Sequence, residues 1–255
     1  MQNCQITYCQ QAKGKSQKRR NQDALFNGKE VLQCYRKITT TFIPDYSHFI
    51  LGVADGVYSS GNSSKASQFW CEQLAECQQN KGSLTYQWLC ETQEVFNTKL
   101  AKHYFGATTT LAAVEIDLKV QQVKLLNVGD SRIYLINSQG EWRQLSYDHT
   151  LLSELTNDPT ANKNDYASIY SGLASYLVAD FQPFQTAYFC DRITVQKGET
   201  LLLCTDGLTD TLSVKKCSEI WQKYATNQQR LNVFHKILLN QKYYDDFSII
   251  CCEFL

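Results

Sequence analysis

The sequence predicts an α+β fold with antiparallel sheets, and two observations lead to this class. Residues 106–146 hold short runs rich in β-branched and apolar residues, separated by turn residues, which predicts an antiparallel meander. Elsewhere strands and helices are mixed without the regular alternation that a parallel sheet requires. The 255 residues contain three prolines and no linker or composition shift, so we expect one domain spanning residues 1–255.

The first elements follow from apolar spacing. Residues 47–54 form a short apolar run and predict a buried strand. Residues 61–79 begin with small polar residues and then place apolar side chains at helical spacing, and residues 84–104 repeat this spacing, so two helices are expected. The meander that follows should contain strands within 106–117, 120–129, 131–137 and 141–146.

The last third of the chain is more varied. Residues 150–190 are polar and irregular. The leucine-rich start of residues 200–207 predicts a strand, and residues 213–225 and 228–240 predict two helices. The apolar run 247–254 should close the chain as a strand.

Composition excludes several classes of function. The 25 basic and 25 acidic residues cancel and form no basic stripe, which argues against a nucleic-acid partner. No apolar run is long enough to span a bilayer, and the N-terminus shows no secretory pattern, so no membrane partner is expected. The eleven cysteines include no CxxC pair, which argues against zinc, and several stand in apolar runs as small buried residues. A reducing, cytoplasmic location is expected.

Two acids that follow apolar strands invite a functional interpretation. Asp55 ends residues 47–54 and Asp206 ends the strand that starts at residue 200, and each precedes a glycine. An Asp-Gly pair is also common in hairpin turns, and this alternative suits Asp130, because a β-rich run follows it at once. It does not suit Asp55 or Asp206, because a polar loop and a helix follow each of them. For any one of these acids, a purely structural role stays open.

A second pair of acids, Asp245 and Asp246, comes directly before the closing strand. Neighbouring antiparallel strands begin and end at a shared edge, so these carboxylates could meet Asp55 and Asp206 there. Like charges at one edge would raise each other's pKa, and a divalent cation would relieve the repulsion. All-oxygen ligands favour Mg²⁺ or Mn²⁺ over zinc.

Such a site suits hydrolysis of a phosphate ester. Asp55 would bridge two ions, the Gly56 carbonyl could bind one of them, and Asp206 and Asp245 would hold the other. Two ions can lower the pKa of a shared water and position it for in-line attack on phosphorus.

An ordered series of motifs resembles the protein phosphatase 2C family in its short bacterial form, the metal-dependent serine/threonine phosphatases. The motifs are NQDALF at 21–26, VADGV at 53–57, GATTTLAAV at 106–114, NVGDSRIYLI at 127–136, LLLCTDGLTD at 201–210 and DDFSII at 245–250. The series covers nearly the whole chain. It implies an αββα sandwich of two antiparallel sheets flanked by helices, with a dinuclear Mn²⁺ or Mg²⁺ centre and hydrolysis of phosphoserine and phosphothreonine.

The resemblance also implies residue roles. Asp55 matches the bridging ligand, Gly56 the carbonyl ligand, and Asp206 and Asp245 the remaining ligands. Asp246 stands where the family usually has asparagine.

Further positions match less central parts of the family site. Asp23 matches an acid that supports the water molecules around the ions, and Asp130 matches a ligand of a third, weaker ion. Residues 150–180 match the variable flap near the active site.

Two departures concern substrate binding. The family usually has an arginine five residues before the first acid, and here that position is Lys18, followed by Arg19. Lysine binds phosphate without the fork geometry of arginine, so either Lys18 or Arg19 would contact the substrate phosphate, or the basic loop has no catalytic role. Tyr58 and Ser59 replace the usual glycine pair and could narrow the mouth of the pocket.

Three alternatives stay open beside the phosphatase. The chain could be a catalytically weak pseudo-phosphatase that acts as a binding module, a hydrolase of small phosphomonoesters, or an interaction domain whose acids only form turns and caps. For the phosphatase, the expected partner is a phosphorylated protein substrate of a serine/threonine kinase, and the expected oligomeric state is a monomer.

Overall fold

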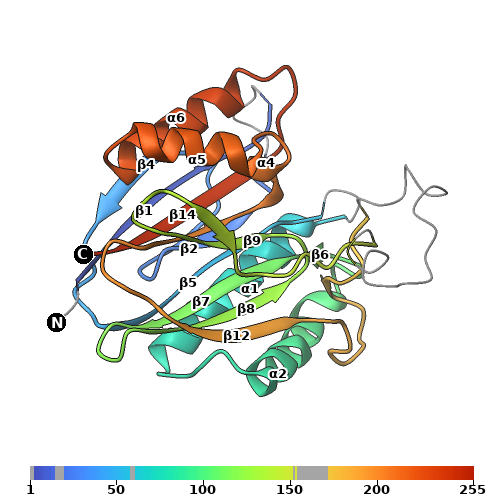
Figure 1. The fold of residues 1–255 in the computed structure, drawn as a ribbon. Helices are drawn as coiled ribbons and strands as arrows, with labels where there is room; N and C mark the ends of the chain where they lie inside the picture. Colours follow the sequence, from blue (N-terminus) through green and yellow to red (C-terminus); the bar gives the residue numbers. More distant parts are fainter. Residues whose placement is uncertain (1–2, 15–19, 58–60, 152, 154–171) are drawn as a thin grey trace, which may run out of the picture.

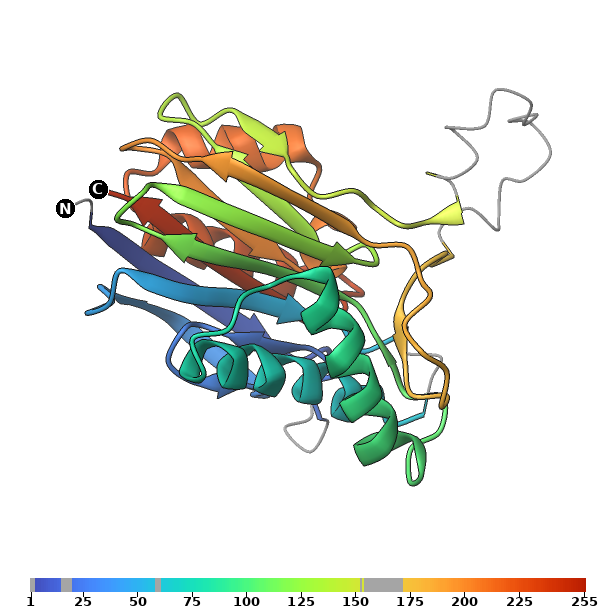
Figure 2. The same cartoon turned by 90° about the horizontal axis from the view of Figure 1, so that it is seen from below.

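Two antiparallel sheets face each other, and helices cover the outer face of each (Figures 1 and 2). The structure is a computed structural model that describes residues 3–14, 20–57, 61–151, 153 and 172–255. This arrangement is the expected αββα sandwich. Most of the expected flap lies outside the described residues. No helix in the described ranges is both long and apolar enough to cross a membrane.

The first sheet has six strands in the described part of the chain. Their order is β10 (Trp142–Gln144), β9 (Arg132–Ile136), β13 (Thr200–Cys204), β14 (Phe247–Phe254), β1 (Cys4–Gln11) and β4 (Arg36–Phe42). All neighbours pair antiparallel. The first and last strands of the chain, β1 and β14, are therefore neighbours in the middle of this sheet.

The second sheet also has six described strands. Their order is β12 (Phe189–Thr194), β8 (Gln122–Val128), β7 (Leu111–Asp117), β5 (His48–Ala54), β2 (Ala24–Phe26) and β3 (Val31–Leu32). A separate short pair joins β6 (Thr108–Thr109) to β11 (Leu177–Val178) at one end of the sandwich (Figure 1).

Helices cover the sheets from outside. The second sheet is covered by α1 (Ser63–Gln79), α2 (Tyr86–Phe96) and the π-helical turn η1 (Asn97–Ala101), and the first sheet by α4 (Asp206–Thr209), α5 (Val214–Lys223) and α6 (Asn227–Leu239). Side-chain caps define several helix starts. The Thr85 hydroxyl accepts a bond from the Trp88 amide at 3.1 Å, and Thr226 and Gln229 form a reciprocal capping box.

Three apolar layers hold the sandwich together. Ile250 and Leu203 pack between the two sheets, whereas Ile249 and Leu202 face α5 and α6. A third layer joins α1 and α2 to the second sheet, with Trp70 at its centre. Because successive residues of a strand face opposite sides, strands buried on both faces need continuous apolar runs. This explains why the runs at 200–204 and 247–254 show no polar alternation.

The expected single meander is wrong. The strand β8 pairs with β7 and β12 in the second sheet, whereas β9 pairs with β10 and β13 in the first. The chain therefore crosses between sheets at Gly129 and Asp130. Gly129 has a φ of 96°, a conformation that favours glycine, and a Cβ there would lie 2.6 Å from Thr110 Cγ2. The hairpin-turn alternative for Asp130 is wrong for the same reason.

The sequence pattern did not reveal β1, although this strand is central. Its glutamines obscure the apolar pattern, yet Gln10 is fully buried. Its side chain donates to the Ser248 hydroxyl at 2.9 Å and accepts from the Cys34 amide at 2.7 Å. The buried amide is therefore hydrogen-bonded, and burying such a group then has little cost.

Candidate active site

Carboxylates from distant parts of the chain line one cleft of about 610 Å³ at one end of the sandwich. The acidic residues on its wall are Asp55, Asp130, Asp206, Asp245 and Asp246, and Gly56 lies among them. The residues expected as ligands thus all line this cleft. The two sheets contribute from opposite sides: Asp55 follows β5 of the second sheet, whereas Asp206 follows β13 of the first. The expectation that one sheet edge would carry them was too narrow.

The glycines of the two Asp-Gly pairs permit close backbone approaches. A Cβ on Gly56 would lie 2.5 Å from the Gln22 carbonyl oxygen. A Cβ on Gly207 would lie 2.1 Å from the Asp246 carbonyl oxygen. Both distances are far inside van der Waals contact, so only glycine fits without a shift of the backbone. The second approach sets the start of α4 against the start of β14, which places Asp206 beside the Asp245–Asp246 pair.

Threonines of the GATTT motif position Asp55. Its amide donates to the Thr110 hydroxyl at 3.1 Å, and its carbonyl accepts from the Thr109 hydroxyl at 2.7 Å. The Thr110 hydroxyl also lies 2.7 Å from that of Ser131, next to Asp130. Sequence reasoning identified this motif only through the family resemblance. The threonines hold the backbone of Asp55 and connect it, through Ser131, to the segment that contains Asp130.

Asp23 is completely buried next to this group. Its Oδ2 accepts from the Thr205 hydroxyl at 2.8 Å and the Ser248 hydroxyl at 3.0 Å. Its Oδ1 is buried and has no hydrogen-bond partner among the described residues. Burial, with a further contribution from Asp246, raises the pKa of this carboxyl well above its ordinary value.

Three acids of the cleft, Asp55, Asp130 and Asp206, have raised pKa values. Burial first, and then the neighbouring Asp206 and Asp23, hold the pKa of Asp55 well above its ordinary value. Burial and the charge of Asp206 raise the pKa of Asp130 to about 7. Burial raises the pKa of Asp206 as well, against the opposing effect of its hydrogen bond with Asp55. The site therefore holds more negative charge than its surroundings can stabilise.

Asp245 and Asp246 have different partners. Asp245 is 55% exposed, and its Oδ1 lies 2.8 Å from the Lys13 ammonium. Asp246 is buried and accepts from the backbone amides of Lys13 at 2.5 Å and Gln22 at 3.0 Å. Asp246 thus ties the segment after β1 and the segment before β2 to the start of β14.

The donor set fits hard divalent cations, although its side chains are not gathered around one point. In the described ranges, no group of three or more His, Cys, Asp or Glu side chains is arranged closely enough to hold a metal ion. Asp245 instead contacts Lys13. The donors are all oxygens, the pKa values of Asp55 and Asp130 are raised, and Asp23 Oδ1 has no partner in the described chain. These features are typical of a site for Mg²⁺ or Mn²⁺.

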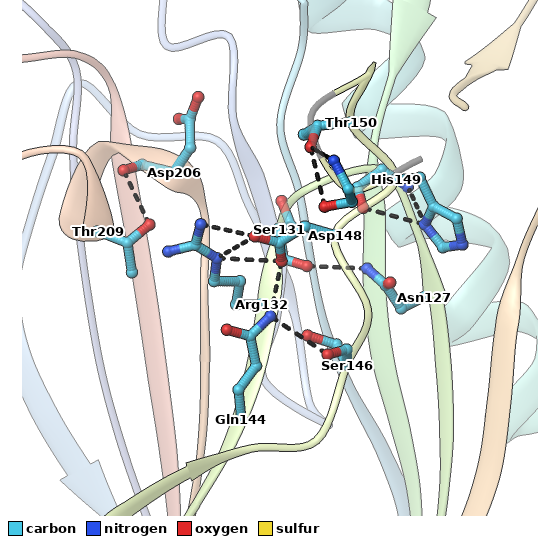
Figure 3. Close-up of polar contacts among 12 residues, drawn as sticks. Asn127, Ser131, Arg132, Gln144, Ser146, Asp148, His149, Thr150, Asp206 and Thr209 are labelled. Atoms are coloured by element: carbon cyan, nitrogen blue, oxygen red, sulfur yellow. Dashed lines mark hydrogen bonds and ion pairs between the residues drawn. The ribbon is translucent and has the colours of Figure 1, made fainter. Parts of the chain in front are cut away.

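A second polar network flanks the cleft (Figure 3). The Arg132 guanidinium contacts the Asp148 carboxylate at 2.6 Å, and Gln144 donates to the same carboxylate at 2.7 Å. In Figure 3, Arg132 lies between Asp148 and the turn that contains Asp206. The sequence did not reveal Arg132 or Asp148 as site residues, because no local motif indicates that these two side chains form an ion pair. His149 has a structural role, since its Nδ1 lies 3.1 Å from the Gly129 carbonyl oxygen.

Three expected contributors cannot be placed. Lys18 and Arg19, the expected phosphate contacts, lie outside the described residues, and so does Tyr58.

The family model for protein phosphatase 2C matches residues 17–238. This chain belongs to the protein phosphatase 2C family. The serine/threonine phosphatase stp of Listeria innocua serovar 6a is 29% identical over 202 residues, covering 72% of this chain and 76% of the relative. The stp protein of Listeria monocytogenes serovar 1/2a has the same identity and coverage. The family resemblance found in the sequence is thus confirmed.

Solved structures show the same fold. The serine/threonine phosphatase PstP/Ppp of Mycobacterium tuberculosis has a TM-score of 0.74 at 19% identity, covering 98% of each chain. Stp1 of Staphylococcus aureus has a TM-score of 0.71 at 20% identity, covering 97% of this chain and 94% of its own. A structure of the PstP catalytic domain in complex with two manganese ions has a TM-score of 0.71 at 19% identity, covering 99% of both chains.

Gly207→Ala should destabilise the protein by about 1–3 kcal/mol, because the new Cβ would overlap the backbone of Asp246. Urea unfolding would measure this change. Gly61→Ala is the matched control, because no atom of the described residues lies within 4 Å of its Cβ position, and it should change stability by less than about 0.5 kcal/mol. Equal effects of the two substitutions would contradict the proposed need for glycine at position 207.

Asp130→Asn should stabilise the metal-free protein at high pH. The raised pKa of Asp130 means that the folded state holds a proton that the unfolded state releases at lower pH. Folding stability is therefore lost as the pH rises from about 4 to about 7. The variant should exceed the original chain by about 1 kcal/mol or more at about pH 8, and by much less at about pH 5.

Urea midpoints in the presence of a chelator would test this dependence at both pH values. The control is Asp191→Asn, on the exposed face of β12. A gain for Asp130→Asn that is the same at both pH values would argue against the titration of this carboxyl.

Proposed function

We propose that this protein phosphatase hydrolyses phosphoserine and phosphothreonine in proteins with two Mn²⁺ or Mg²⁺ ions. The observation that carries the proposal is the meeting of carboxylates from both sheets in one cleft, three of them (Asp55, Asp130 and Asp206) with raised pKa values, in a chain that belongs to the family. The two manganese ions in the PstP catalytic-domain structure support the choice of metal. The serine/threonine phosphatase names of the Listeria relatives support the choice of substrate.

Each carboxylate of the cleft has a role in this proposal. Asp55 would bridge the two ions, the Gly56 carbonyl would bind one of them, and Asp206 and Asp245 would complete the other. When bound, the ions would lower the pKa of a shared water and neutralise the phosphate oxygens. Asp130 is the proposed ligand of a third, weaker ion. The raised pKa values of Asp55 and Asp130 support these roles, because cations would stabilise their charged forms.

Asp23 has a separate proposed role. Thr205 and Ser248 hold its Oδ2, which leaves Oδ1 to accept a hydrogen bond from a water molecule near the ions. The carboxylate would orient that water, and the two hydroxyls would keep the carboxylate from turning away. The buried position of Asp23 supports this role, since a buried carboxylate oxygen without any partner would be costly.

The wider context is also proposed. The substrates would be phosphoproteins made by a serine/threonine kinase, Lys18 or Arg19 would contact the substrate phosphate, and the protein would act as a cytoplasmic monomer. The near-neutral balance of charges supports a protein partner over nucleic acid.

Asp55→Asn should lower metal-dependent phosphatase activity by about 100-fold or more, because an uncharged amide with a single oxygen would replace the bridging carboxylate. The fold should remain, and in a chelator the variant should be at least as stable as the original chain, because one buried like charge is removed. Phosphate release from a phosphothreonine peptide and thermal unfolding with and without Mn²⁺ would measure both effects. Full activity in the variant would refute the mechanism. No Mn²⁺-dependent turnover by the original chain would favour the pseudo-phosphatase.

Lys13→Met should tighten metal binding. The Lys13 ammonium contacts Asp245 and would compete with an ion for its oxygens. Exposed ion pairs contribute up to about 1 kcal/mol, so the concentration of Mn²⁺ that gives the half-maximal rise in melting temperature should fall by about two- to fivefold. Lys216→Met, which breaks an exposed pair with Glu219 on α5, should leave it unchanged. Weaker binding in Lys13→Met would mean that Lys13 supports the ion.

A further inference from the structure

Exposed aromatic side chains stand beside the acidic cleft. Phe105 is 69% exposed and Phe181 is 59% exposed, and their rings stack with centroids 6.0 Å apart. A soluble protein seldom leaves two large apolar rings together in water unless they have a binding partner. We call these two rings the aromatic pair.

The backbone that presents Phe181 is held in an unfavourable conformation. Its φ is 65°, in the left-handed region that non-glycine residues rarely adopt. Asn97, almost fully buried, fixes this turn: its Oδ1 accepts from the amides of Asp180 and Phe181, both at 3.2 Å, and its Nδ2 donates to the Gln182 carbonyl at 2.5 Å. Because such strain persists only where the surroundings enforce it, the exposed ring is presented on a rigid turn.

Asn97 itself lies at a local irregularity of the helix. It begins the π-helical turn η1, directly after α2. Such π-helical turns interrupt the regular helix and are frequent at functional sites. Here the π-helical turn begins with Asn97, whose side chain holds the turn at residues 180–182.

The residues of the aromatic pair are chain neighbours of residues that line the cleft or its adjoining groove. Phe105 precedes Gly106, which lines the cleft, and the Gly106 amide donates to the Ala179 carbonyl at 2.8 Å. On the other segment, Tyr176 and Val178 line both the cleft and an adjoining groove of about 260 Å³. The two segments, joined by the pairing of β6 and β11, lie side by side at one end of the molecule (Figure 2).

We propose that the aromatic pair and the adjoining groove bind the polypeptide that flanks the phosphorylated residue of a protein substrate. Neither Phe105 nor Phe181 lines the cleft, so a small phosphate ester held among the carboxylates would not reach them. A polypeptide that leaves the cleft past Tyr176 would meet the groove, whose lining residues Asp180 and Gln182 flank Phe181. Apolar side chains of the substrate would stack on the two rings, as is common at protein interfaces. This inference rests on the proposed function.

The test compares one double variant on substrates of different length. Phe181→Asn removes the ring but tolerates the left-handed backbone, and Phe105→Ser removes its neighbour. The substrates are p-nitrophenyl phosphate, a phosphothreonine tripeptide, and a phosphothreonine peptide of about fifteen residues with leucine and phenylalanine on both sides. The control variant is Ile43→Ser: Ile43 is 57% exposed and follows the end of β4 that lies away from the cleft.

The double variant should lower kcat/KM for the long peptide by about tenfold, mainly through KM, and leave the two short substrates within about twofold. The control should match the original chain on all three. Equal losses on all substrates, or no loss on the long peptide, would overturn the inference. If the double variant fails to fold, Phe181→Asn alone should show the same selectivity with a smaller loss.

The activity of the unsubstituted chain on the three substrates distinguishes a failure of this inference from a failure of the proposed function. If it releases phosphate from none of the substrates with Mn²⁺, the proposed function fails and the inference fails with it. If it acts on all three and the double variant behaves as the original chain does, only the inference fails.

Discussion

The crowding of carboxylates at the seam between two sheets is the constraint on which the site depends. Each acid of the cleft stands where a strand ends or begins, and burial raises the pKa of Asp55, Asp130 and Asp206. Such a cluster destabilises a fold unless cations or protons neutralise it. The apolar layers on both faces of each sheet supply the rigidity that holds these charges together. Stability is therefore given up locally to create a place where hard ions bind.

The backbone, more than the side chains, sets the geometry of the cleft. Glycines allow α4 to touch the start of β14, and threonine hydroxyls hold the carbonyl and amide of Asp55. The Asp246 carboxylate accepts hydrogen bonds from two backbone amides. Few of the polar groups around the cleft are thus free to move independently. This preorganisation is what a hydrolase needs when its positioning groups must not reorganise during the reaction.

The sequence revealed the parts of the site whose signal is local. Asp55 and Asp206 could be predicted because each follows an apolar strand and precedes a glycine, and no hairpin partner follows either of them. Asp130 was misjudged as a possible hairpin turn, because nothing in the sequence states that β8 and β9 belong to different sheets. The clamp by Asn97 on residues 180–182 was invisible for the same reason: it joins residues more than eighty positions apart. Contacts between residues far apart in the sequence determine these features, and the spacing of apolar residues gives no information about such contacts.

The pairing of β1 with β14 has a consequence for how the protein is made. The register runs from Cys4 opposite Phe254 to Gln11 opposite Phe247, so β1 gains this neighbour only after residues 247–254 have been made. A nascent chain on the ribosome cannot complete the first sheet, or bring Asp245 to the cleft, until residues 245–254 have been synthesised. Contacts of such long sequence separation also slow folding. A chain cut short before residue 245 would therefore lack both β14 and the Asp245 and Asp246 carboxylates of the cleft.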